Sequence, residues 1–229
     1  MNKLTKHLLT LAIAAAAASP ALANTVKFTG FTHGSQSVIA TLATPNTALV
    51  RTVSAGGVNM VLNGGPSFEA YCVDLYQTIA FNTVYTDEYT TPASLTHSFT
   101  NSNAYFDIGR LFANAGPILD AVHEAAFQIA IWEIAYEKNT SYDITQGAAS
   151  FAGTVGAMQL ASGWLADLHG TPRTLGVIES ALRQDMITPV PEPSTYLLMA
   201  LGLLGITYVA KRRREQGAGR GPATVYTMA

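Results

Sequence analysis

Apolar segments near the two ends of this 229-residue chain confine a folded domain to the residues between them. The first segment follows Lys3 and Lys6, covers residues 8–18 and ends at the sequence Ala-Leu-Ala of residues 21–23. A short basic start, an apolar stretch too short to span a bilayer and a small-x-small ending are typical of a secretory signal peptide. We expect residues 1–23 to be a signal peptide cleaved after Ala23. The alternative is an uncleaved N-terminal anchor.

The second apolar segment has a different order of features. Val190-Pro191-Glu192-Pro193 is followed by an apolar stretch at 194–210 and then by Lys211-Arg212-Arg213-Arg214. The prolines prevent regular helix and keep Glu192 extended and accessible. A stretch of about 17 residues is near the lower limit for a membrane helix, and a basic cluster after it stays in the cytoplasm as a stop-transfer signal. We predict a transmembrane helix at 194–210 and a cytoplasmic tail at 216–229.

The order of motif, apolar helix and basic cluster over residues 190–214 resembles the PEP-CTERM sorting signal of Gram-negative bacteria, and we assign residues 186–215 to this signal. The resemblance implies that a membrane protease-transpeptidase, exosortase, recognises the motif. The protein would then cross the inner membrane, be held there transiently, and end at the cell surface or in the extracellular matrix of a biofilm. An ordinary single-span tail anchor is the alternative.

The residues between the signals, 24–185, predict one domain. Alternating apolar residues indicate short strands, and helical spacing indicates helices in the second half. The expected strands are 26–31, 37–42, 58–62 and 68–75, with a turn at 63–66; the expected helices are 103–113, 117–138, 157–168 and 175–186. Strands followed by helices predict an α+β fold, which we expect to be a short-stranded β-sandwich or barrel with a helical subdomain.

Composition narrows the classes of function. The net charge of −2 does not favour nucleic acid as a partner. The histidines lack the spacing of metal ligands, and the chain has no phosphate loop or dinucleotide motif. We therefore expect no metal and no cofactor.

Cys72 is the one cysteine of the chain. An exported protein meets oxidising conditions, where thiols usually pair, but a single cysteine forms no intramolecular disulfide. Cys72 is therefore buried and inert, joined to another chain, or committed to other chemistry. Strand alternation places it on the same face as Phe68 and Ala70, which indicates an interior position.

Two local motifs favour other chemistry. Tyr71-Cys72-Val73-Asp74 on a strand and Gln128-Ile129-Ala130-Ile131-Trp132 on a helix together resemble the thioester domains of Gram-positive surface adhesins, over residues 68–137. The resemblance implies a thioester between Cys72 and Gln128. A rigid strand facing a rigid helix can supply the effective molarity that attack on a carboxamide needs. Such a protein is a single-use reagent for amine-bearing protein or polysaccharide targets and not an enzyme.

Neighbouring side chains have expected supporting roles. Tyr71 and Trp132 would shield the thioester from water. Glu124 lies one turn before Gln128 and is a candidate base for an attacking amine, and His123 is a weaker candidate. Val73 and Phe127 depart from the residues that the family often has beside the cysteine and the glutamine.

Two other functions remain open at this point. The same fold could serve as a non-reactive structural protein of the extracellular matrix, with Cys72 as a small buried apolar residue. Alternatively, Cys72 could act with His123 or His97 in a cysteine hydrolase, which would require the two side chains to be close in space.

Overall fold

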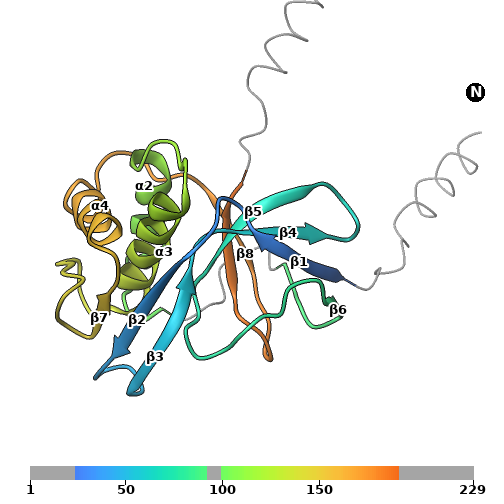
Figure 1. Cartoon of the computed structure of the whole chain (residues 1–229), viewed down its shortest axis with the longest axis horizontal. Coiled ribbons are helices and arrows are strands. Elements are labelled where there is room, and N and C mark those ends of the chain that lie inside the picture. Colours follow the sequence, from blue (N-terminus) through green and yellow to red (C-terminus); the bar gives the residue numbers. More distant parts are fainter. Residues whose placement is uncertain (1–23, 92–98, 191–229) are drawn as a thin grey trace, which may run out of the picture. The chain divides into compact units, whose positions relative to one another are not determined.

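The computed structural model describes residues 24–91 and 99–190 (Figure 1). The predicted signal peptide, the sorting motif from Pro191 onward, the membrane helix at 194–210, the basic cluster, the tail and His97 lie outside the described residues. No helix within the described ranges has the length and apolar character needed to cross a membrane.

The described residues form an α+β fold, as predicted. Its strands are β1 Thr25–Phe31, β2 Gln36–Leu42, β3 Leu49–Ala55, β4 Val58–Leu62, β5 Ser67–Cys72, β6 Val84–Thr86, β7 Ala149–Ala152, β8 Leu175–Ile178 and β9 Met186–Pro189. Its helices are α2 Ala104–Asn114, α3 Ala121–Tyr136 and α4 Val155–Ala166.

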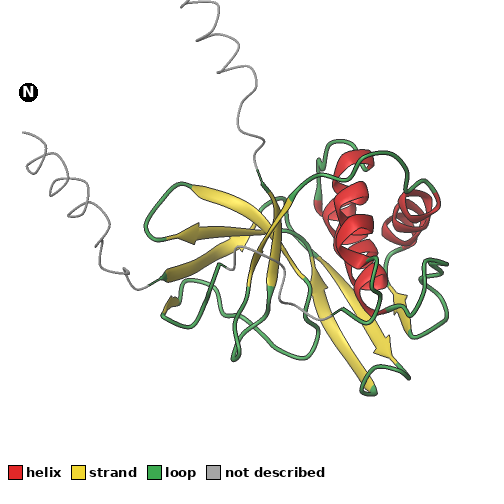
Figure 2. Cartoon of the chain, turned by 180° about the vertical axis from the view of Figure 1, so that it is seen from behind, coloured by secondary structure: helices red, strands yellow, loops and turns green. Residues whose placement is uncertain are grey.

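The strands make two antiparallel sheets. One has the order β6-β1-β4-β5-β9-β8 and the other the order β3-β2-β7. The helices gather at one end of the described region, beside the three-stranded sheet (Figure 2). Helix α3 contacts strands of both sheets and both other helices, so it is the element around which the core assembles.

Helix α3 begins later than predicted, at Ala121 rather than near Pro117. The Asp120 carboxylate accepts hydrogen bonds from the backbone N–H groups of Val122 and His123, which is a favourable N-cap arrangement. Every residue from Glu124 to Tyr136 is buried. The helix therefore buries polar side chains as well as apolar ones, and each polar one needs a hydrogen-bonding partner.

The prediction of a helix at residues 175–186 is wrong. This segment forms β8 and a loop that leads to β9, and β9 pairs with β5 through Cys72↔Met186. The segment contains good helix formers, but pairing with an existing sheet edge and burial of Ile187 outweigh that local preference. The domain consequently extends to Pro189, beyond the predicted boundary at Asp185. Strands β3, β6 and β7 lie outside the predicted strands, and β5 ends at Cys72 rather than at Leu75.

Strand β9 should be essential for stability. Ile187 is fully buried, so Ile187→Ala should lower the free energy of unfolding by about 2–5 kcal/mol, measured by chemical denaturation. Leu182→Ala is the matched control, because Leu182 is 69% exposed in the loop before β9 and should change stability by less than about 0.5 kcal/mol. Equal effects of the two substitutions would contradict the placement of β9 in the sheet.

Candidate functional site

The structure brings Cys72 and Gln128 together at the contact between β5 and α3. The Gln128 carboxamide oxygen accepts a hydrogen bond from the Cys72 backbone N–H (3.0 Å), and its nitrogen donates to the Cys72 carbonyl oxygen (2.7 Å). Gln128 is fully buried. The carboxamide is therefore fixed against the main chain of the residue that carries the thiol.

The thiol of Cys72 has contacts of its own. Sγ donates to the side-chain oxygen of Gln184 (3.2 Å) and lies 3.8 Å from the sulfur of Met186. Burial, with a contribution from the charge of Asp74, raises the pKa of the Cys72 thiol to about 12. The thiol is therefore protonated at neutral pH. Its neighbours Gln184 and Met186 were not predicted from the sequence.

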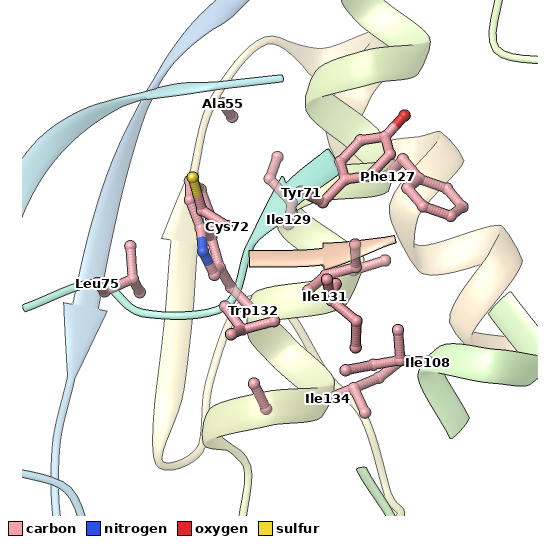
Figure 3. Close-up of a cluster of buried hydrophobic side chains, with 14 of the residues drawn as sticks. Ala55, Tyr71, Cys72, Leu75, Ile108, Phe127, Ile129, Ile131, Trp132 and Ile134 are labelled. Carbon is pink, nitrogen blue, oxygen red and sulfur yellow. The ribbon is translucent and has the colours of Figure 1, made fainter. Parts of the chain in front are cut away.

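Cys72 and Trp132 line one cavity of about 290 Å³. Figure 3 shows the indole of Trp132 beside the Cys72 side chain, and the ring stacks on Phe151 with centroids 6.2 Å apart. Trp132 therefore lies beside the thiol, and its shielding role stays a prediction. Tyr71 differs, because its ring packs against Phe112 and Phe127, with centroids 5.8 and 4.8 Å away. Tyr71 is on the face of β5 opposite the thiol, so a shielding role does not fit its orientation.

Glu124 does not act on the Cys72–Gln128 pair in this structure. It is fully buried, and its carboxylate accepts from Gly57 N (2.8 Å) and Tyr71 OH (3.0 Å) and pairs with His33 Nδ1 (2.8 Å). These contacts lie on the Tyr71 side of β5, away from the thiol. The predicted role of Glu124 as a base therefore has no geometric support.

The histidine candidates also lie elsewhere. His123 Nδ1 is 2.8 Å from the Asp120 carboxylate, and its ring faces Trp164. In the described part of the chain, the Cys72 thiol donates to Gln184 and lies near the sulfur of Met186, and no histidine is among its hydrogen-bonding partners. A cysteine hydrolase needs a base within hydrogen-bonding reach of the thiol, and His123 does not provide one.

A second carboxyl group, the half-buried Glu69, lies beside Glu124. A Cβ atom added to Gly57 would lie 2.6 Å from an oxygen of Glu69 and 2.7 Å from an oxygen of Glu124, so both groups crowd this glycine. Burial first, and then the neighbouring Glu124, raises the pKa of Glu69 to about 7. The hydrogen bond to Glu124 raises the pKa of His33. Two adjacent carboxyl groups thus avoid full ionisation.

This carboxyl cluster, which consists of His33, Glu69, Tyr71 and Glu124, was missed by the sequence analysis. The two-residue spacing of Glu69 and Tyr71 on a strand was a usable signal, but nothing in the sequence links His33 to Glu124. Ligand atoms of His33, Glu69 and Glu124 lie within 4.8 Å of one another, so these three side chains could hold a metal ion. The histidine spacing did not indicate this arrangement.

Stability should therefore fall as pH rises. The pKa of Glu69 in the folded protein, about 7, exceeds its ordinary value of 4.5. The stability that the protonated Glu69 contributes is therefore present at low pH and is lost as pH rises from 4.5 through 7. Glu69→Gln should reduce this decline by about 1–2 kcal/mol, measured by denaturation between pH 4.5 and 8; solvent screening of the half-buried carboxyl keeps the effect below that of the full pKa shift. A remaining decline is expected, because burial also raises the pKa of Glu133 to about 8.

The control for this experiment is Asp120→Asn. The N-cap hydrogen bonds lower the pKa of Asp120 below its ordinary value of 3.8. Its own contribution to stability is lost only as pH falls below 3.8, so the substitution should change the slope between pH 4.5 and 8 much less than Glu69→Gln does. An unchanged slope in Glu69→Gln would contradict the account of the carboxyl cluster.

Comparison with known proteins adds information about the C-terminal segment. Residues 189–214 match the family described as the PEP-CTERM protein-sorting motif. No curated protein matches the chain. Among solved structures, the N-terminal domain of the pilus tip adhesin Cpa of Streptococcus pyogenes is similar at a TM-score of 0.41 and 15% identity, over 69% of this chain and 95% of that one. So distant a likeness carries no argument about the site. The chain carries a PEP-CTERM sorting signal, which marks it for exosortase-dependent export.

Proposed function

We propose that this exported protein attaches covalently to amine-bearing targets through an internal thioester between Cys72 and Gln128. The observation that carries the proposal is the pair of hydrogen bonds that holds the buried Gln128 carboxamide on the main chain of Cys72. A strand and a helix fix the two residues, so the reacting groups need little further ordering.

The geometry supports a direct route to the bond. The Cys72 N–H polarises the carboxamide by donating to its oxygen, which favours attack at the side-chain carbonyl carbon of Gln128. Sγ first leaves its hydrogen bond to Gln184 and then forms the C–S bond. The C–N bond breaks, and the nitrogen takes the thiol proton and leaves as ammonia. No oxidant or cofactor is needed.

The environment of the sulfur supports a thioester that persists until a target arrives. Cys72 is only 7% exposed, and Trp132 lies beside it, which limits access of water. An amine that reaches the bond would displace the sulfur once, without turnover.

The sorting signal supports a place of action outside the inner membrane. Exosortase would process the chain while it is transiently anchored, and the domain would then act at the cell surface or in the extracellular matrix. Its target would be a protein or polysaccharide that carries an accessible amine.

One observation favours a second candidate function. The thiol is protonated and hydrogen-bonded to Gln184, which is also how an inert buried cysteine would sit. On that basis the protein would be a non-reactive structural component of the biofilm matrix on the same fold.

Intact mass separates the two candidates. The freshly purified exported protein, including β9, should have a mass one ammonia below its sequence mass. Exposure to methylamine should then convert it to a product heavier by one methylamine than this form. A mass equal to that of the sequence, with a free thiol and no adduct, would exclude the thioester and favour the structural protein.

Three variants identify the residues involved. Cys72→Ala and Gln128→Ala should each abolish the loss of ammonia and the adduct. Gln184→Ala is the matched control, because Gln184 also contacts the thiol but should not form the bond. If Gln184→Ala lost the adduct and Gln128→Ala kept it, the acyl group would belong to Gln184 and not to Gln128.

A further inference from the structure

Strand β3 has one unpaired edge. It pairs with β2 along its whole length, from Gln36↔Ala55 to Leu42↔Leu49, and it is the end strand of the order β3-β2-β7. Within residues 24–91 and 99–190, no strand pairs with its other edge. A free edge presents main-chain N–H and C=O groups that another extended segment can pair with.

This edge borders the cavity that contains the thiol. Four consecutive residues of β3, 51–54, line the cavity together with Cys72, and residues 77–79 form another part of its lining. Side chains connect the two walls: Arg51 donates to the carbonyl of Leu75 (2.9 Å), and Tyr76 OH donates to the carbonyl of Thr47 (2.7 Å). We call this cavity the thiol groove.

The thiol groove contains unsatisfied polar groups. The indole N–H of Trp132, which is 1% exposed, and the side-chain oxygen of Gln77 are buried and have no hydrogen-bonding partner in the described part of the chain. Buried polar groups are normally paired, so an unpaired donor and an unpaired acceptor in one groove point to a ligand that offers both. The peptide backbone is such a ligand.

The charge of the thiol groove favours a neutral amine. Arg51 is the one charged residue among those that line it, and no carboxylate is among them. A nearby positive charge lowers the pKa of an incoming lysine and so increases the neutral, nucleophilic fraction. Acidic side chains beside that lysine would be attracted to Arg51.

From these features we infer that the target docks as an extended peptide that adds a strand to the free edge of β3 and places a lysine at the thioester. The lysine Nζ attacks the acyl carbon of Gln128, an amide bond forms, and the C–S bond breaks. The sulfur of Cys72 takes the proton that the amine loses. The lysine step rests on the proposed function, whereas the docking step does not require the thioester.

Docking can be measured without the bond, in the Cys72→Ala protein. The probe is a short blocked peptide of alternating threonine and valine with a central lysine flanked by glutamates. Hydrogen exchange should slow at residues 51–54 and remain unchanged at 149–152, because β7 is the other edge of the same sheet and does not line the groove. A peptide N-methylated along one edge should bind at least about tenfold more weakly, because it lacks the main-chain N–H groups that would pair with β3.

Two results would overturn this inference. One is unchanged exchange at residues 51–54 at saturating peptide. The other is protection of the groove by a glucosamine oligomer but not by the peptide, which would assign the groove to a saccharide. The mass experiment is independent: a thioester without peptide docking overturns only this inference, and docking without a thioester overturns only the proposed function.

Discussion

The paired hydrogen bonds between the Gln128 carboxamide and the Cys72 main chain are the contact on which the rest of the site depends. Helix α3 is buried along most of its length, so the polar side chain of Gln128 would be costly without partners. Cys72 satisfies the carboxamide oxygen and one of its N–H groups. The contact thereby fixes α3 against β5 and, at the same time, holds an electrophilic carbon on the main chain of the residue that carries the thiol.

Strand alternation divides this region into two environments. On one face of β5, the Cys72 thiol meets Gln184 and the groove beside β3. On the other face, Tyr71 reaches Glu124, one helical turn from Gln128. The carboxyl cluster therefore fixes the same strand and helix from the side away from the sulfur. Its role in this account is to position the pair without taking part in the chemistry.

Much of this arrangement could be predicted from sequence, where the signal was local. The α+β class and α2, α3 and α4 follow from periodicity. The pairing of Cys72 with Gln128 was predicted from the family resemblance that two short motifs carry. Strand β9 could not be predicted, because it depends on pairing with β5. Gln184, His33 and Gly57 reach the site from loops distant in sequence, so no spacing indicates them. Strand and helix spacing alone predict that Tyr71 and Glu124 lie beside the thiol. Packing of α3 against β5 instead places the two side chains together on the opposite face of β5.

A crystal structure of the freshly purified exported protein tests the central claim most directly. The account predicts continuous electron density from Cys72 Sγ to the side-chain carbonyl carbon of Gln128, with the Gln128 nitrogen missing. It also predicts that Gln184 has lost its hydrogen bond from the thiol. Separate side chains, with the intact Gln128 carboxamide on the main chain of Cys72 and the thiol on Gln184, would contradict the account.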